Sequence, residues 1–93
     1  MTFTVAAEDT AEALGSGDLP VLGTPRLLAW CEAATCVAAR TALQPGQTTV
    51  GSRIALLHLR PTPLGEAVTV HATPLGADGR MLRFEVRATD ARG

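Results

Sequence analysis

The 93-residue sequence contains no lysine, so all eight of its cationic side chains are arginines. Nine acidic residues bring the formal net charge to −1, which leaves no basic stripe for nucleic acid, and we expect no nucleic-acid partner. Apolar residues make up 46% of the chain, which is typical of a globular protein rather than a disordered one. A chain of this length forms one domain with one core.

Long apolar runs and targeting signals are also missing. No uninterrupted apolar run approaches the roughly 20 residues that a membrane-spanning helix needs. The N-terminus, Met1 to Val5, lacks the basic region followed by an apolar stretch that marks a signal peptide. We therefore expect no membrane partner and a cytoplasmic location.

Cysteine is scarce, with only Cys31 and Cys36 present. Their five-residue spacing points the two thiols in different directions around a helix, which is poor geometry for a disulfide. Two sulfurs without a matching pair elsewhere do not make a zinc site. We predict buried free thiols and no metal, which suits a cytoplasm.

One long helix is predicted over residues 24–43. Thr24 is a good N-cap, Pro25 suits the first helical position, and a Gln-Pro-Gly sequence stops the helix. The helix is apolar nearly all the way round, with Arg26 and Arg40 as its obvious solvent-facing edge. Such a helix is normally buried on several sides.

Outside the helix the apolar residues alternate with polar ones, which predicts strands. We expect these strands over residues 2–6, 48–60, 68–73 and 82–87. Residues 15–18, Gly-Ser-Gly-Asp, indicate a mobile, lid-like segment before the helix, and residues 77–79, Ala-Asp-Gly, indicate a hairpin. A buried helix followed by an antiparallel meander gives an α+β fold.

Three polar residues stand where an apolar core is expected. Thr24 opens the helix, and Glu32 is one of only two charges in residues 27–43. His58 interrupts the apolar strand at residues 54–59. A hydroxyl, a carboxylate and an imidazole are the groups from which an acyl-transfer or hydrolysis site is built.

The offsets between these residues resemble those of hotdog-fold thioesterases related to the fluoroacetyl-CoA-specific thioesterase. The shared features are a Thr before the central helix (Thr24), a Glu eight residues later (Glu32), and a Gly-x6-His strand from Gly51 to His58. The Pro-x-Pro-x-Gly turn and the Asp-Gly-Arg hairpin also match. The resemblance covers residues 21–90.

This resemblance implies one hotdog domain over residues 1–93, in which a curved antiparallel sheet wraps a central helix. An N-terminal strand and lid would occupy residues 1–22, the helix residues 24–43, and the antiparallel strands residues 48–90. The family's last strand would be missing, because the meander ends with its third strand, so either the domain is shortened or the sequence is incomplete at its C-terminus. A homodimer is also implied, since hotdog domains usually pair.

In that family a Thr, a Glu and a His hydrolyse an acyl-CoA thioester to a free acid and CoA, without a cofactor. The resemblance therefore makes Thr24, Glu32 and His58 catalytic candidates and places Gly51 against the acyl group. The start of the helix also offers N–H groups for polarising the thioester carbonyl. Since Pro25 has none, Arg26 and Leu27 would supply them, which makes Arg26 a substrate-binding candidate. The lid lacks the aromatic side chains of the fluoroacetate-specific member, which favours a broader range of short acyl groups.

Each candidate also has an ordinary structural explanation. Thr24 could simply cap the helix, Glu32 could pair with an arginine, and His58 could be a partly buried histidine with satisfied hydrogen bonds. At the level of function, the alternative is a hotdog module that binds acyl-CoA or dimerises without turnover. Hydration of an enoyl thioester would use an Asp/His pair that the helix lacks. The acyl group, the carrier (CoA or carrier protein) and the choice between a Thr nucleophile and an activated water stay open.

Overall fold

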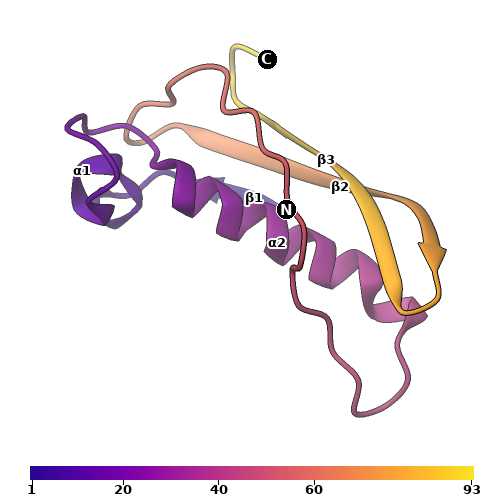
Figure 1. Cartoon of the computed structure of the whole chain (residues 1–93). Helices are drawn as coiled ribbons and strands as arrows, with labels where there is room; N and C mark the ends of the chain where they lie inside the picture. The colour runs from indigo at the N-terminus through magenta and orange to yellow at the C-terminus, as the bar shows by residue number, and fades with distance from the viewer.

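A single long helix lies against one face of a three-stranded antiparallel sheet in the computed structural model, which describes all 93 residues (Figure 1). The strands are β1 (Thr2–Thr4), β2 (Ala67–Asp78) and β3 (Met81–Thr89), in the order β1-β2-β3. The helices are η1 (Ala7–Asp9), α1 (Ala11–Leu14), α2 (Thr24–Ala39) and η2 (Arg40–Ala42). None of the helices combines the length and apolarity needed to cross a membrane.

The sheet confirms three of the four predicted strands. β2 and β3 form a hairpin that turns at Gly79, whose positive φ of 63° favours glycine. Along β2 the side chains of Val68 and Val70 point into the core, while Thr69 and His71 point to solvent. β1 pairs with the start of β2 through residues 2–4 and 67–69. This alternation gives the sheet one buried and one wet face.

The core fills the space between α2 and the sheet. Phe3 of β1 stacks on Trp30 of α2, with ring centroids 4.6 Å apart and an interplanar angle of 3°. The buried cluster consists of Val5, Leu22, Leu27, Trp30, Cys31, Ala34, Val68 and Val70. Part of α2 stays uncovered, since Ala29 and Val37 are exposed. The helix of the single chain is therefore less buried than the sequence predicted.

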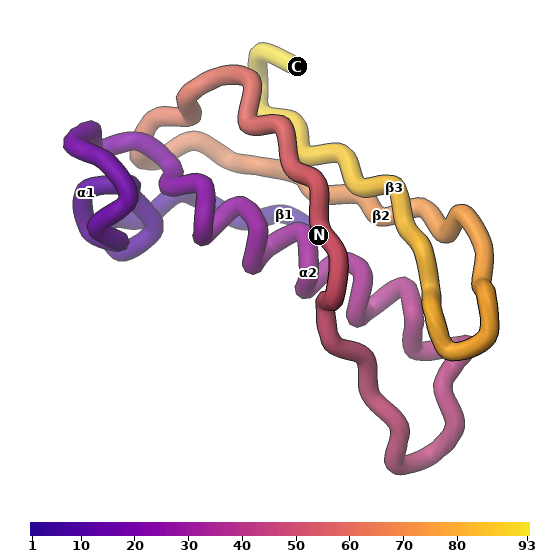
Figure 2. Tube along the Cα trace, viewed as in Figure 1, coloured from indigo at the N-terminus to yellow at the C-terminus, as the bar shows by residue number.

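Residues 48–60 do not form the predicted strand. The segment passes over α2 and then reaches the end of β3 (Figure 2), but no backbone hydrogen bond joins it to another part of the chain. The alternation was still informative, since Leu56 and His58 are half-buried while Leu57 and Leu59 are each 82% exposed. A strand needs a neighbouring strand, and none lies alongside this segment.

Candidate active site

Thr24 is the first residue of α2, whereas the sequence predicted it as the N-cap that precedes the helix. The N-cap is Gly23, whose carbonyl accepts the N–H groups of Arg26 and Leu27, each at 3.0 Å. The Thr24 side chain makes no capping hydrogen bond. Its Oγ1 lies 2.8 Å from Nδ1 of His58 instead. The explanation of Thr24 as a simple helix cap is therefore wrong, and its hydroxyl faces the predicted imidazole.

His58 is half-buried on the extended segment that runs past the start of α2. Its Nε2 atom is buried and has no hydrogen-bond partner, so Thr24 is the single polar partner of the ring. In the tautomer that carries the proton on Nε2, the Thr24 hydroxyl donates to Nδ1. A hydroxyl that donates to a neutral imidazole is the arrangement of a nucleophile, or of a water-holding group, beside a general base.

Glu32 lies two turns further along α2 and faces Gly51. A Cβ atom at Gly51 would stand 2.5 Å from Oε2 of Glu32, so only glycine allows this close approach. The carboxylate of Glu32 makes no ion pair, which rules out the alternative of a salt bridge to an arginine. The structure thus brings Thr24 to His58 and Glu32 to Gly51, but no hydrogen bond joins Glu32 to His58.

Arg26 is engaged within the chain. Its Nε lies 3.0 Å from Oδ1 of Asp9, in an ion pair that is not aligned as a hydrogen bond, and its backbone N–H donates to Gly23. The N–H group that finds no partner at the start of α2 belongs to Thr24 itself. The free donor therefore lies two residues before the predicted Arg26. The predicted contact of Arg26 with substrate stays a prediction.

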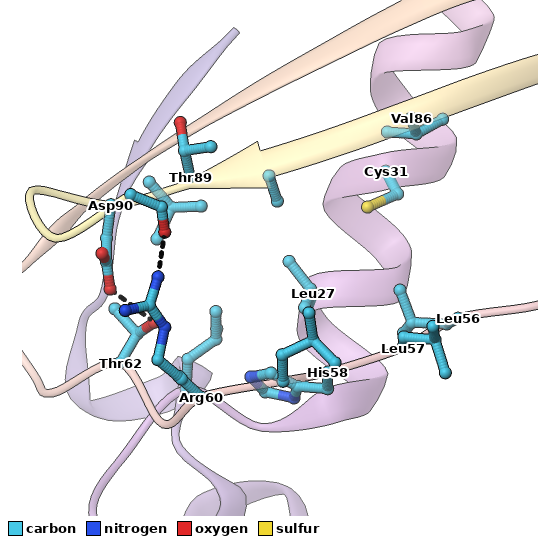
Figure 3. A pocket seen from close by; sticks show the side chains of 15 residues that line it. Leu27, Cys31, Leu56, Leu57, His58, Arg60, Thr62, Val86, Thr89 and Asp90 are labelled. Atoms are coloured by element: carbon cyan, nitrogen blue, oxygen red, sulfur yellow. Dashed lines mark hydrogen bonds between the residues drawn. The ribbon is translucent and has the colours of Figure 1, made fainter.

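Two cavities meet at His58. An open one of about 240 Å³ contains Thr24 and His58 and is bordered by Ser16 of the lid-like segment. The other, of about 150 Å³, lies on the far side of His58 between the extended segment and β3 (Figure 3). It is lined largely by apolar side chains, among them Leu27, Cys31, Leu56, Val68 and Val86. His58 thus borders both the open cavity and the narrower chamber, whose lining residues are mostly apolar.

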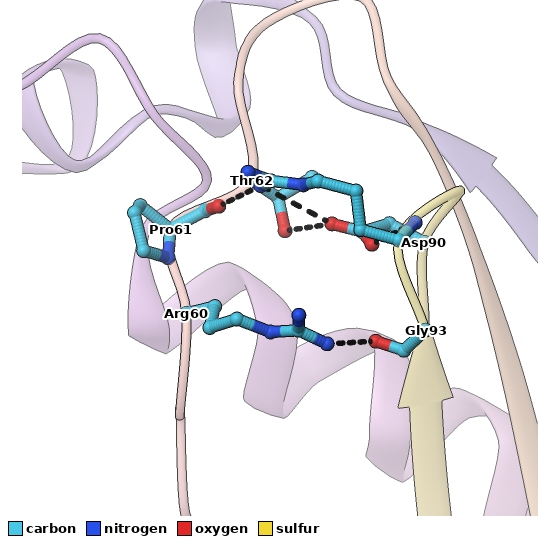
Figure 4. Close-up of polar contacts among 6 residues, drawn as sticks. Arg60, Pro61, Thr62, Asp90 and Gly93 are labelled. Carbon is cyan, nitrogen blue, oxygen red and sulfur yellow. Dashed lines mark hydrogen bonds and ion pairs between the residues drawn. The ribbon is translucent and has the colours of Figure 1, made fainter.

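A polar link holds the end of the extended segment against the residues that follow β3 (Figure 4). Arg60 donates to the carbonyl of Gly93 at 2.6 Å, and Thr62 donates to Oδ2 of Asp90 at 3.2 Å. Arg92 donates to Pro61 through its guanidinium and to Asp90 through its backbone N–H. That backbone N–H, helped by Thr62, lowers the pKa of Asp90 below its ordinary value.

The two thiols have different surroundings. Both cysteines are free, as predicted, but only Cys31 is buried, and burial raises the pKa of its thiol. Cys36 is exposed, with Sγ 3.8 Å from Oγ1 of Thr49, because the sheet covers one side of α2 only. No three His, Cys, Asp or Glu side chains gather in a group that could hold a metal.

Asp9 was missed by the sequence analysis, although it lies close to the site. It is a buried acid, 8% exposed, and its partner Arg26 is 17 residues away. No helical or strand periodicity links residues at that distance. The local signal was the three-residue spacing from Ala6 to Asp9, where the Asp9 carboxylate accepts the Ala6 N–H at 2.9 Å.

Several known proteins are similar to this chain in sequence and fold. The sequence model of the fluoroacetyl-CoA-specific thioesterase (FlK) matches residues 5–93. A solved structure of FlK is 30% identical, with a TM-score of 0.90 over 98% of this chain and 72% of that chain. A mutant of FlK in complex with fluoroacetate and CoA is 29% identical, with a TM-score of 0.89 over 97% and 75%. A mutant in complex with acetyl-CoA is 28% identical, with a TM-score of 0.90 over 98% and 73%. No curated protein matches the chain.

The fold and these relatives define a hotdog-fold thioesterase, an enzyme class that hydrolyses acyl-CoA thioesters. Within that class, the chain belongs to the fluoroacetyl-CoA-specific thioesterase family. The predicted resemblance and fold class are confirmed. The chain spans 72 to 75% of these relatives' chains and has a three-stranded sheet, in keeping with the expected lack of the family's last strand.

Proposed function

We propose that the chain hydrolyses a short-chain acyl-CoA thioester to a free acid and CoA, with Thr24, Glu32 and His58 as its catalytic residues. The observation that carries the proposal is the 2.8 Å contact between Oγ1 of Thr24 and Nδ1 of His58. Two polar residues 34 positions apart meet at the start of the one long helix, on the border of an open cavity. No cofactor is needed, because CoA enters as part of the substrate.

In the route with a Thr nucleophile, Oγ1 of Thr24 attacks the thioester carbonyl while Nδ1 of His58 takes the hydroxyl proton. The carbon–sulfur bond then breaks, and the leaving CoA thiolate receives the proton from the imidazolium. A water molecule next attacks the acyl-Thr24 ester and gives a proton to His58, which passes it to Oγ1 of Thr24 as the bond between that oxygen and the acyl carbon breaks and the acid leaves. In the route with an activated water, Thr24 and His58 hold the water, His58 takes its proton as it attacks the thioester carbonyl, and the same proton goes to the CoA thiolate when the carbon–sulfur bond breaks.

The oxyanion of either route would form beside the unpartnered N–H of Thr24. That donor lies at the positive end of the α2 dipole, where negative charge is stabilised. We assign Glu32 and Gly51 to the acyl side of the site, because the Glu32 carboxylate lies close against the backbone of Gly51, where a Cβ would block it. There Glu32 would orient or deprotonate the water that completes hydrolysis.

A short acyl group is supported by two observations. The solved relatives are described with fluoroacetate or acetyl-CoA, both of which carry two-carbon acyl groups. The apolar chamber behind His58 measures about 150 Å³, which is small. Residues 15–22 contain no aromatic side chain to shape the site for a fluorinated group. We therefore propose a range of short acyl groups rather than strict selectivity for fluoroacetyl.

We also propose a homodimer. Val50, Leu57 and Leu59 on the extended segment are 82 to 86% exposed, and the adjoining side of α2 is uncovered. A second copy of the chain would bury this apolar surface, which also borders the site. A cytoplasmic location stays our prediction, since it rests on the free thiols and the N-terminal sequence.

The alternative function is a module that binds acyl-CoA without turnover. It is favoured by one observation, the lack of a hydrogen bond between Glu32 and His58, which leaves Glu32 apart from the Thr24–His58 pair. A binding module would use the same cavities but would not need a nucleophile beside a base.

The deciding experiment measures CoA release from a panel of short acyl-CoA thioesters by chromatography, which avoids thiol reagents that react with Cys36. Replacing the imidazole in His58→Ala should lower kcat about 100-fold or more, since it removes the general base. His71→Ala is the matched control, because His71 is exposed on β2, and it should leave turnover unchanged. A folded wild-type protein that releases no CoA from any thioester would leave only the binding function.

A further inference from the structure

Asp9 is a buried acid that the proposed mechanism does not use. Its residue is 8% exposed, although it lies in the single-turn helix η1 near the N-terminus. A buried carboxylate is costly unless it is paired and hydrogen-bonded, so its partners indicate what it holds in place.

The partners of Asp9 flank Thr24 on both sides. Its carbonyl accepts the N–H of Gly23 at 2.9 Å, and its Oδ1 lies 3.0 Å from Nε of Arg26. Its other carboxylate oxygen accepts the N–H of Ala6 at 2.9 Å, which fixes the carboxylate within η1. One residue therefore holds the backbone just before Thr24 and the side chain two residues after it.

The backbone at Gly23 is also seated directly on α1. A Cβ atom there would stand 2.9 Å from Cδ1 of Leu14 and 3.1 Å from Cα of Ala11. The N–H of Ala11 donates to the carbonyl of Val21 at 2.7 Å, which ties α1 to the strand-like approach to the helix. The start of α2 is thus fixed by contacts from residues 6–14.

The other half of the catalytic contact has no such support. His58 lies on residues 48–60, which make no backbone hydrogen bond to the rest of the chain. A contact of 2.8 Å between Thr24 and His58 needs at least one fixed side. A displacement of about 1 Å at a reacting group can cost on the order of 100-fold in rate.

We propose that Asp9 is a positioning residue that holds Thr24 at hydrogen-bond distance from His58 through Gly23 and Arg26. The inference rests on the proposed function for its catalytic consequence, but its geometric consequence can be tested without turnover. Asp9 itself does not touch the open cavity beside Thr24.

The experiment compares Asp9→Asn with the matched control Glu8→Gln. Asn keeps an oxygen for the Ala6 N–H but removes the charge that pairs with Arg26, whereas Glu8 is exposed. The readout is the ring ¹⁵N resonances of the two histidines. In Asp9→Asn the resonances of His58 should shift while those of His71 stay in place, and Glu8→Gln should move neither.

Kinetics supply the second readout. Asp9→Asn should lower kcat about 10-fold with little change in KM, because the nucleophile is displaced while the cavity remains. In a Thr24→Ala background the same substitution should have no further effect on the remaining rate. A purely structural role for Asp9 would instead lower the thermal midpoint and act equally in both backgrounds.

Unchanged His58 resonances in folded Asp9→Asn protein would overturn the inference, as would equal rate losses with and without Thr24. If Asp9→Asn does not fold, Arg26→Gln removes the other member of the ion pair and must give the same His58 shift. If the wild-type protein lacks turnover, the proposed function fails, and the histidine spectra still decide whether Asp9 positions Thr24.

Discussion

The two segments that meet at the candidate site are held in opposite ways. Thr24 belongs to a helix whose start is fixed by Asp9, Gly23 and α1 through backbone hydrogen bonds and an ion pair. His58 and Gly51 belong to an extended segment that lacks backbone hydrogen bonds to the rest of the chain. Local stability follows such contacts, so the site joins a firmly held segment to a loosely held one.

Hydrogen exchange should show the largest difference between the two segments. Amides in residues 50–60 have no acceptor, so they should exchange near the rate of an unstructured chain. Amides inside α2 and in the β2–β3 pairing should exchange about 1,000-fold more slowly or more, as expected when exchange requires global unfolding.

This measurement belongs at a protein concentration where sedimentation shows a single chain, since a second copy is proposed to cover residues 50–59. Equal protection of residues 50–60 and of α2 under those conditions would contradict the prediction, because it would show that the extended segment is as stable as the helix.

Two glycines, one in each segment, allow the firmly held and the loosely held side of the site to be perturbed separately. Gly51→Ala places a Cβ against the flexible end of Glu32, so it should lower turnover about 10- to 100-fold with little loss of stability. Gly23→Ala places a Cβ 3.1 Å from the backbone of Ala11, which cannot move as easily. It should destabilise the fold by about 1 to 3 kcal/mol.

Kinetics and urea unfolding on both variants test this pair. Ser52→Ala, next to Gly51 in the exposed part of the segment, is the control and should change neither property. A Gly51→Ala protein that loses stability but keeps its turnover would show that the extended segment contributes to the fold rather than to the site.

The smallest effect should come from the polar link at the end of the extended segment. The pKa of Asp90 is lowered in the folded chain by the N–H of Arg92, so its contribution to stability is present above the unfolded pKa and lost as pH falls. At pH 7 we expect a thermal midpoint of Asp90→Asn slightly below that of the wild type. The difference between the two midpoints should shrink as pH falls below the unfolded pKa of about 4, because Asp90 then becomes protonated.

Thermal unfolding between pH 3 and pH 7 tests this expectation, with Asp18→Asn in the exposed loop as the control. A difference that persists at low pH would show that the Asn variant perturbs the link by its shape rather than by its charge.

The helix, the hairpin and the two residues in contact at the site, Thr24 and His58, could be predicted from the sequence. The N-cap was predicted one residue too late, at Thr24 instead of Gly23, and with Gly23 as N-cap the Thr24 hydroxyl is free for His58. At its other end α2 stops at Ala39 rather than at the predicted residue 43, and η2 follows it. Capping preferences describe a side chain that has no better partner, and a distant imidazole cannot be read from local sequence.

Neither the lack of a strand at residues 48–60 nor the role of Asp9 could be predicted, for related reasons. Alternation correctly gave the inward direction of Leu56 and His58, but strand formation depends on a neighbour elsewhere in the chain. Likewise the Asp9–Arg26 pair joins residues that share no element. Non-local partners decide both, and a single sequence carries no direct signal for them.

The extended segment at residues 48–60 also determines which part of the molecule would unfold first on heating or in denaturant. Both Gly51 and His58 lie on residues 48–60, and the polar link at Asp90 ties down only one end of that segment. Warming or mild denaturant would release the histidine while the core beneath α2 stays folded. The enzyme would therefore lose activity at a lower temperature than the one at which its core unfolds. A bound substrate that contacts both segments would stabilise the site and delay this loss.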